Sequence, residues 1–131
     1  MKTWIILLGA IGFFSSPVFA QDEPVEPVQE IWTDPVTGGD WSFAHPALNW
    51  FDALEACGED FALPDHPTIA HALRRLKNTF IAERLRDADT RLVWSNEEVS
   101  WRSAMVVRTT NGSASGEYKR YLHAVLCYRA N

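Results

Sequence analysis

The sequence "IWTDPVTGGDW", residues 31–41, sets a proline and two adjacent glycines between hydrophobic residues. The side chain of Asp34 can hydrogen-bond the backbone two residues further on, and Pro35 fixes a φ that suits a turn. The two glycines tolerate a positive φ. The stretch therefore predicts a short strand, a tight reversal and a return strand through Trp41 and Phe43.

The start of the chain has the features of a cleavable secretory signal. Lys2 precedes an apolar run over residues 4–14, and small residues stand just before Gln21. This arrangement is typical of an export signal that is removed after translocation. A membrane-spanning helix needs about 20 apolar residues, and Pro17 interrupts this run. We therefore expect residues 1–20 to be cleaved and no stable membrane anchor to remain.

The rest of the chain has the length of one domain and is acidic. The sequence has 12 Lys and Arg against 17 Asp and Glu, a net charge of −5. Such a balance disfavours nucleic acid and anionic membrane surfaces as partners. Residues 21–30, "QDEPVEPVQE", combine acids with prolines and contain little that could pack, so they predict a flexible lead-in. The folded domain is expected over residues 31–131.

The first helical pattern lies in "HPALNWFDALEACGE", residues 45–59. Leu48, Phe51 and Leu54, together with Ala47 and Trp50, recur at helical spacings and predict one broad apolar stripe. Pro46 suits the first helical turn, and Gly58 suits the position just past the end.

A second helical pattern covers residues 65–89, "DHPTIAHALRRLKNTFIAERLRDAD". It predicts one helix that is capped by Asp65 or His66 and has Pro67 in its first turn. Acidic residues interleave with its basic ones, so its charged residues are interpreted mostly as a solvated face and not as a binding patch. These residues are Arg74, Arg75, Lys77, Glu83, Arg84 and Arg86.

The remaining sequence has the composition of strands. "RLVWS" (residues 91–95), "SAMVVRTT" (103–110) and "KRYLHAVLCYR" (119–129) are rich in β-branched and apolar residues. Asn111 and Gly112 predict a turn that continues as a loop through Gly116. The element order predicts an α+β fold in which the first strand pairs with the last. Trp94, within an apolar strand, is expected in the core.

The two cysteines predict a disulfide. Cys57 ends the first predicted helix and Cys127 lies in the last predicted strand. An even number of cysteines in an exported chain favours a bridge, while a reactive thiol or a metal pair is the less favoured alternative. On the chain-entropy model, a loop of this length destabilises the unfolded state by about 4 kcal/mol.

Five short motifs follow one another along residues 31–129 and carry a family resemblance. The matching residues are Asp34, Thr37, Gly38 and Trp41; Ala53 and Cys57; Leu63 and Pro64, with Thr68 displaced; Trp94 and Ser95; and Val125, Cys127 and Arg129. Their order and the paired cysteines resemble the C-type-lectin-like domain. Within it, the chain is similar to the bacterial branch named after the C-terminal domain of the collagen-like adhesin Lcl. Gly39 and Ala62 depart from that branch, which has Leu and Arg there.

The resemblance implies two helices packed on antiparallel sheets, with paired N- and C-terminal strands and one disulfide. It also implies that Trp41 packs on the first helix. The formylglycine-generating relatives of this fold are much longer, and their reactive cysteines have no counterpart here once Cys57 and Cys127 are bridged.

Metal-site and catalytic patterns are weak in this sequence. His66 and His71 are five residues apart, about 140° around a helix, so they do not form a metal-binding pair. His45 and His66 each precede a proline, where a capping role is simpler, and His123 lies in a predicted strand. The chain has no G-x-S-x-G motif, phosphate-binding loop or dinucleotide fingerprint. We therefore expect neither a metal ion nor another cofactor.

Calcium-dependent sugar binding is a further possibility that the fold resemblance raises. The sugar-binding lectins use Glu-Pro-Asn or Gln-Pro-Asp together with Trp-Asn-Asp, and none of these occurs here. Oxygen donors are nevertheless present in two acidic stretches, which are more typical of solvated loops. These donors are Asp87, Asp89, Asn96, Glu97 and Glu98.

The segment "NEEVSWR", residues 96–102, is the leading candidate for a ligand surface. Trp101 and Arg102 are residue types enriched at binding hot spots. A surface turn with a half-buried tryptophan is the competing interpretation. The predicted ligand-binding residues are Asn96, Glu97, Glu98, Trp101 and Arg102, and residues 111–119 are a second candidate surface.

These observations predict an exported, periplasmic or secreted binding module without enzymatic activity. It would be adhesin-like or a partner of an envelope protein, and it would recognise a glycan or protein ligand through loops on a disulfide-bonded scaffold. One alternative is an extracytoplasmic enzyme or enzyme accessory that uses Glu97, Glu98 and a histidine. Another is a structural component of a surface appendage.

Overall fold

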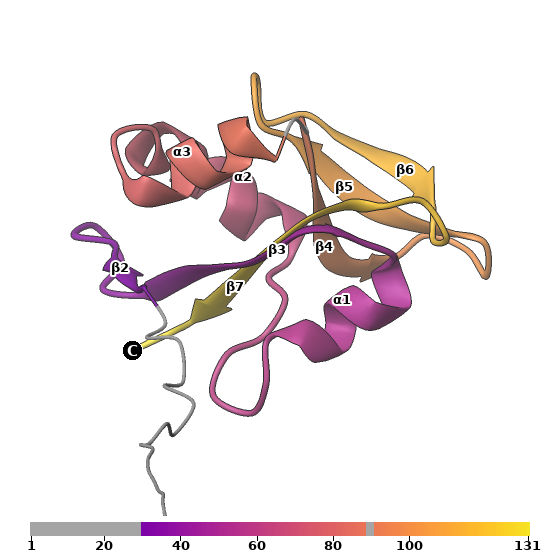
Figure 1. Cartoon of the computed structure of the whole chain (residues 1–131), viewed down its shortest axis with the longest axis horizontal. Helices are drawn as coiled ribbons and strands as arrows, with labels where there is room; N and C mark the ends of the chain where they lie inside the picture. Colours follow the sequence, from indigo (N-terminus) through magenta and orange to yellow (C-terminus); the bar gives the residue numbers. More distant parts are fainter. Residues whose placement is uncertain (1–29, 89–90) are drawn as a thin grey trace, which may run out of the picture.

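The computed structural model describes residues 30–88 and 91–131. The predicted signal, the lead-in up to residue 29, and Asp89 lie outside the described residues. The elements are, in chain order (Figure 1), β2 (Trp32–Thr33), β3 (Asp40–Leu48), α1 (Trp50–Ala56), α2 (His66–Leu76), α3 (Phe80–Asp87), β4 (Leu92–Glu98), β5 (Ser103–Arg108), β6 (Ala114–Tyr118) and β7 (His123–Arg129). The predicted α+β class is confirmed. No helix in the described part of the chain is long and apolar enough to cross a bilayer.

One six-stranded sheet organises the domain, with strand order β2-β3-β7-β4-β5-β6. The return strand of the predicted hairpin, β3, pairs antiparallel with the last strand, and Trp41 lies opposite Tyr128. The first strand of that hairpin, β2, pairs with β3 at the sheet edge, so the expectation that the first strand pairs with the last is wrong. Strand β4 pairs parallel with β7 at Val93 and Ala124. Because β7 inserts between β3 and β4, which run in opposite directions, it must be parallel to one of them. The sheet is therefore mixed, and the expectation of purely antiparallel sheets is wrong.

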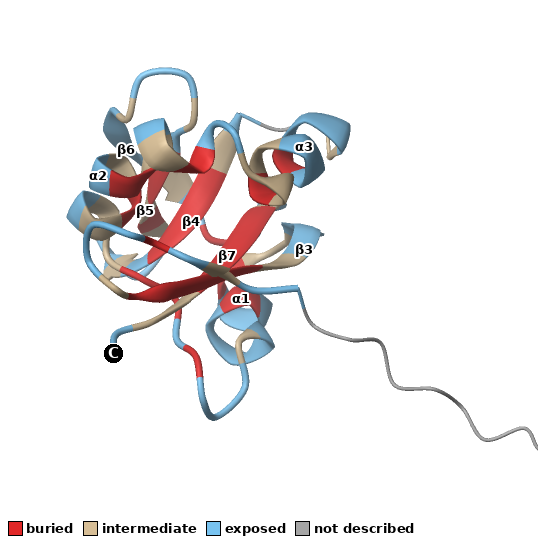
Figure 2. Ribbon diagram, turned by 90° about the vertical axis from the view of Figure 1, so that its left-hand side faces the viewer, coloured by how far each residue is buried: buried red, intermediate tan, exposed pale blue. Residues whose placement is uncertain are grey.

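Both faces of the central strands are buried, since successive side chains of a strand point to opposite faces (Figure 2). On β7, Ala124 and Leu126 face α2 and α3, whereas Val125 and Cys127 belong to the cluster around α1. Trp94 is fully buried in the α1 cluster, as predicted, and its Nε1 donates to the carbonyl of Leu48 at 2.8 Å.

The first helix is shorter than the periodicity predicts. Strand β3 continues to Leu48, so Pro46 lies in a strand and not in a helical turn. The β3–β7 register is irregular between His45 and Leu48, and there a missing backbone N–H is tolerated. Helix α1 begins after Asn49, whose side chain caps it by accepting from the backbone N–H of Asp52 at 2.9 Å.

The second predicted helix is two helices, which makes three helices in the described residues rather than two. Asp65 caps α2, as predicted, by accepting from the N–H of Thr68 at 3.0 Å. Thr79 then interrupts the helix: its hydroxyl donates to the carbonyl of Leu76 at 2.7 Å and accepts from the N–H of Ile81. Threonine is a favoured helix cap, and here its side chain bonds both the last carbonyl of α2 and an N–H in the first turn of α3.

Two packing expectations for the N-terminal hairpin are corrected. Trp41 packs in the α2–α3 cluster and not on α1, because its register opposite Tyr128 directs it to that face. Arg75 is not on a solvated face: it binds the buried carboxylate of Asp34 through Nε and Nη2, at 2.7–2.9 Å. This ion pair fastens the turn to α2.

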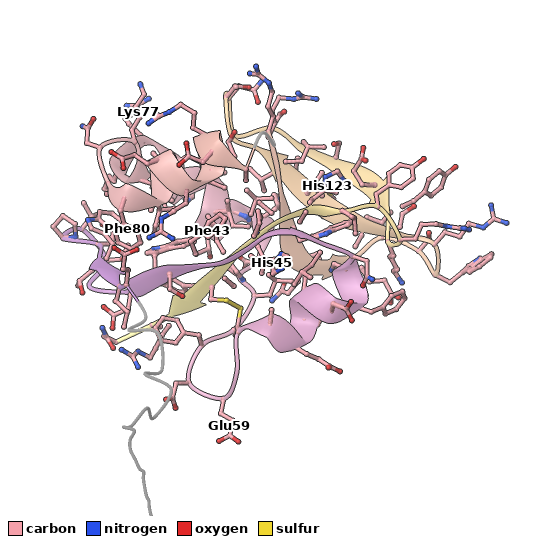
Figure 3. All side chains as sticks on the ribbon, in the orientation of Figure 1. Phe43, His45, Glu59, Lys77, Phe80 and His123 are labelled. Atoms are coloured by element: carbon pink, nitrogen blue, oxygen red, sulfur yellow. A yellow bond between two sulfur atoms is a disulfide. The ribbon has the colours of Figure 1, made fainter. Side chains whose placement is uncertain are left out.

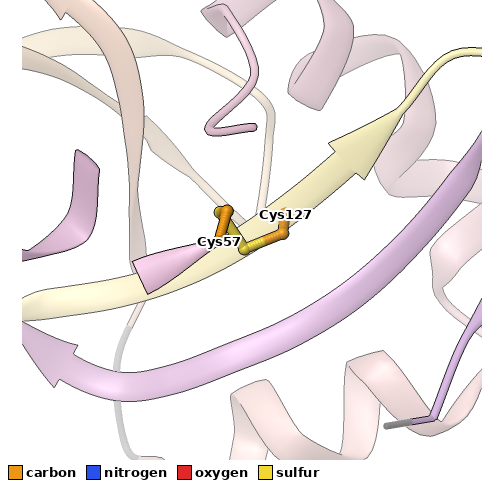
Figure 4. The surroundings of a disulfide bond; sticks show 2 residues. All are labelled: Cys57 and Cys127. Carbon is orange, nitrogen blue, oxygen red and sulfur yellow. A yellow bond between two sulfur atoms is a disulfide. The ribbon is translucent and has the colours of Figure 1, made fainter. Parts of the chain in front are cut away.

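The predicted disulfide between Cys57 and Cys127 is present (Figure 4). Its Cα atoms are 5.5 Å apart, and it joins the end of α1 to β7 across 70 residues of sequence. Because β7 is central in the sheet, the bridge ties α1 to the core. A disulfide is typical of proteins that fold in an oxidising compartment.

Candidate functional site

The tip between β4 and β5 holds Trp101 on the surface. Val99 and Ser100 both donate backbone hydrogen bonds to the carbonyl of Ser103, at 2.9 and 3.0 Å, which closes the tip tightly. The Trp101 side chain is 76% exposed, and the Arg102 guanidinium lies 4.5 Å from its ring centroid. The predicted exposure of Trp101 is confirmed. Its ring projects from a short hairpin into solvent, and the guanidinium of Arg102 stacks on it.

Trp101 forms one wall of an open hollow of about 620 Å³ at this end of the molecule. We call its lining the aromatic–cationic face, since every residue in it is aromatic or basic. The face consists of Phe51, Trp101, Arg102, Tyr118, Lys119, Arg120 and Tyr121. Figure 3 draws the side chains at this end of the molecule, which lies beyond His123 as seen from Phe43.

Backbone hydrogen bonds join the three elements that supply the aromatic–cationic face. The N–H of Trp50, at the start of α1, donates to the carbonyl of Lys119 at 2.9 Å. The N–H of Lys119 in turn donates to the carbonyl of Arg102 at 2.8 Å. The β6–β7 turn is therefore bonded to α1 on one side and to the β4–β5 tip on the other, so the hollow is formed before a ligand arrives.

Lys119 is the buried cation of the aromatic–cationic face. Its side chain is only 5% exposed, pairs with the carboxylate of Glu98, and lies 4.7 Å from the ring centroid of Trp50. Its charge is thus satisfied within the protein. Arg102 and Arg120 make no ion pair with any described residue. The free positive charge of the face comes from these two arginines.

The structure separates the five residues that the sequence analysis proposed as ligand contacts. Trp101 and Arg102 line the hollow, and Glu98 touches it only through Lys119. Glu97 does not line the hollow, and its carboxylate pairs with the Nδ1 atom of His66 at 2.5 Å. Asn96 is exposed, but it does not line the hollow either.

Phe51, Arg120 and Tyr121 complete the face and were not proposed from sequence, whereas Tyr118 and Lys119 belong to the second candidate surface. Phe51 was assigned to the apolar stripe with Trp50 and Leu54; Trp50 is buried, but Phe51 is 56% exposed and Leu54 42%, because α1 turns Trp50 and Ala53 to the core. Arg120 and Tyr121 come from "YKRY", residues 118–121, which lies just before β7. The combination of aromatic and basic residues in this stretch was an available signal. The second candidate surface, 111–119, is mostly strand β6, and only its last two residues reach the face.

The histidines have local partners. His45 accepts from the N–H of Ala47 at 3.0 Å, and so it stabilises a strand irregularity instead of a helix cap. His123 packs edge-on against Trp94 and lies 3.2 Å from Glu117. Burial lowers the pKa of His123, while Glu117 acts in the opposite direction. Within residues 30–88 and 91–131, no three His, Cys, Asp or Glu side chains are grouped so that they could hold a metal ion.

No family model matches this sequence, and no match is found among curated proteins.

Proposed function

We propose that the chain is an exported binding module without enzymatic activity that recognises a glycan or protein ligand through the aromatic–cationic face. We also propose that its scaffold is a C-type-lectin-like domain. Support for the scaffold comes from the β3–β7 pairing near the chain ends, the helices inserted between β3 and β4, and the bridge from α1 to β7. In this role the disulfide and backbone bonds hold the recognition loops fixed.

The observation that carries this proposal is the composition of the preformed hollow. Soluble domains seldom cluster exposed apolar side chains unless the cluster has a partner. Aromatic rings and arginines are also the residue types that contribute most to binding energy. Trp101, three-quarters exposed and stacked with Arg102, presents a flat apolar surface beside a cation. Sugar rings and peptide side chains both pack on such surfaces.

The alternative enzymatic role has one specific observation in its favour, the pair between Glu97 and His66. Both side chains are about one-third exposed, so a substrate could reach them. Glu98, by contrast, already pairs with Lys119. A hydrolase activity that is lost in Glu97→Gln and retained in Trp101→Ala would favour this alternative over the binding module.

The test compares the parent chain with Trp101→Ala on a glycan array and in a pull-down from envelope extract. We expect Trp101→Ala to lose the bound glycan or protein while its melting temperature stays within a few degrees, since the side chain is exposed. Val36→Ala is the matched control, because it removes an exposed apolar side chain from the N-terminal hairpin. Trp94→Ala shows the effect of removing a core side chain, and it should lower the free energy of unfolding by about 3–5 kcal/mol. Unchanged ligand binding by Trp101→Ala would contradict the proposed face.

A further inference from the structure

The lead-in contains a short sequence repeat. Residues 23–28 read Glu-Pro-Val-Glu-Pro-Val, one three-residue unit repeated. A polyproline II helix has three residues per turn, so a sequence of this period in that conformation aligns its prolines on one edge and its glutamates on another. The whole lead-in, residues 21–30, carries acids and no basic residue. In that conformation a peptide of this sequence would present apolar rings and negative charge in two parallel rows.

The aromatic–cationic face has the complementary chemistry. Extended proline-containing peptides dock in grooves lined by aromatic side chains, and neighbouring charges fix their orientation. Tyr118 and Tyr121 meet edge to face at 5.3 Å, about half exposed, and Trp101 stands across the hollow on a separate hairpin. Arg102 and Arg120 have no internal acidic partner among the described residues and can pair with two carboxylates.

The lead-in cannot occupy the face of its own chain. Glu30, the first described residue, pairs with Arg84 of α3, at the β2 end of the molecule. Figure 1 shows the β6–β7 turn at the opposite end, beyond the full length of β3. Val28 is two residues from Glu30 and reaches only about 7 Å from it, whereas the nine residues of β3 extend for roughly 30 Å. An occupant of this sequence must come from a second copy.

We propose that the aromatic–cationic face binds acidic, proline-containing peptide, and that residues 23–28 of a second copy of this chain are its ligand. The inference rests on the proposed function, because it uses the same face. Each chain then offers one peptide and one face, so the contact is head-to-tail and can propagate from copy to copy. Two exposed ion pairs and two prolines supply a weak contact, which becomes significant where many copies are close together.

The experiment titrates a fluorescently labelled synthetic peptide of residues 21–30 with the exported chain and follows anisotropy. Glu23→Gln and Glu26→Gln in the protein prevent its own lead-in from competing. We expect saturable binding that Trp101→Ala weakens about tenfold or more. Arg102→Gln with Arg120→Gln should weaken it several-fold, and so should raising the salt from about 50 mM to about 500 mM. Arg74→Gln, which removes an exposed charge from α2, should leave binding unchanged.

Two peptide controls test the recognised features separately. A peptide with both glutamates of the repeat changed to glutamine removes the charge, and a peptide of the same composition in shuffled order removes the period. We expect both to bind several-fold more weakly. In sedimentation velocity, the parent chain should associate as its concentration rises, and the chain carrying Glu23→Gln and Glu26→Gln should associate less.

Failure of this inference is distinguishable from failure of the proposed function. If the peptide does not bind, or binds Trp101→Ala equally well, the peptide inference is wrong. If Trp101→Ala nevertheless loses a ligand from the array or the extract, the proposed face stands with a different ligand. If the substitution affects neither the peptide nor any other ligand, both proposals are wrong.

Discussion

Arg75→Gln is expected to destabilise the domain by about 3 kcal/mol, because it leaves the carboxylate of Asp34 buried without its cation. Asp34 is 1% exposed and Arg75 27%, and three N–O contacts of 2.7–2.9 Å join them. Removal of one partner from a buried ion pair costs about 3–5 kcal/mol. We take the lower end because Asp34 keeps the hydrogen bond from the N–H of Val36, at 2.9 Å.

The assay is urea unfolding at neutral pH with the disulfide intact, arranged as a double-mutant cycle with Asp34→Asn. We expect the double variant to be more stable than the sum of the two single losses predicts, with a coupling of about 1–3 kcal/mol. Arg74→Gln is the matched control, since it changes the neighbouring arginine, which is exposed. The reasoning is refuted if Arg75→Gln costs no more than Arg74→Gln, or if the two single losses simply add.

Acid titration gives an independent check on the same ion pair. The hydrogen bonds from Arg75 hold the pKa of Asp34 below its usual value of 3.8. A depressed carboxyl pKa stabilises the fold above the pKa of the unfolded chain, and this stability is lost as the pH falls below about 4. Arg75→Gln should therefore unfold with a shallower dependence on pH below that point. Hydrogen bonds from Thr33 and then Arg129 lower the pKa of Asp40 to about 2. Asp40 therefore also makes stability fall with falling pH, and Arg75→Gln leaves this contribution unchanged.

Three further outcomes are expected. Replacing Cys57 and Cys127 together by serine should lower the free energy of unfolding by about 4 kcal/mol, and two free thiols in the native chain by non-reducing mass spectrometry would contradict the bridge. Gly39→Ala should destabilise by about 1–3 kcal/mol, because its Cβ would collide with the ring of Tyr128; a melting temperature equal to that of the parent would refute this. Because burial lowers the pKa of His123, stability should fall as the pH drops below about 6.5, and His123→Gln should flatten that part of the pH profile.

The turn could be predicted from local chemistry, and the disulfide from the cysteine count. The side chain of Asp34 accepts from the N–H two residues on, as its residue type favours, and Gly38 has a φ of +78°. The cysteine pair needs only an exported chain and an even count. What the sequence did not reveal is that the same Asp34 is buried by Arg75, 41 residues away. Arg75 stands among other charged residues of its helix, and nothing in the local sequence indicates that it binds a buried carboxylate.

The break between α2 and α3 was missed for a related reason. The apolar spacing continues from Leu76 to Phe80, so hydrophobic periodicity alone predicts one helix. Thr79 interrupts it with two side-chain hydrogen bonds, and both helices still bury their apolar sides against the same face of the sheet. Hydrophobic periodicity indicates which side of a helix is buried. It does not detect a capping residue that interrupts the helix without changing the buried side.

The candidate site shows where sequence reasoning ends. Trp101 was predicted at the surface because it belongs to a polar segment and is a residue type enriched at binding hot spots. Phe51 and Tyr121, its companions in the hollow, are separated from it by 50 and 20 residues of sequence, and no periodicity links them. They meet because the β6–β7 turn bonds both to α1 and to the β4–β5 tip. The composition of a site built from three segments depends on the strand order, which a single sequence does not display.

The strand order also explains how an acidic chain presents a positive face. The carboxylate of Glu98, at the end of β4, is already engaged by the buried ammonium of Lys119. Arg102 and Arg120 make no ion pair with a described residue, and they lie on two different turns that the backbone bond from Lys119 to Arg102 helps to join. A ligand with two properly spaced negative charges contacts both turns at once and pays little to order them. An uncharged ligand contacts only the rings, so the loss on removing both arginines measures how much of the recognition is electrostatic.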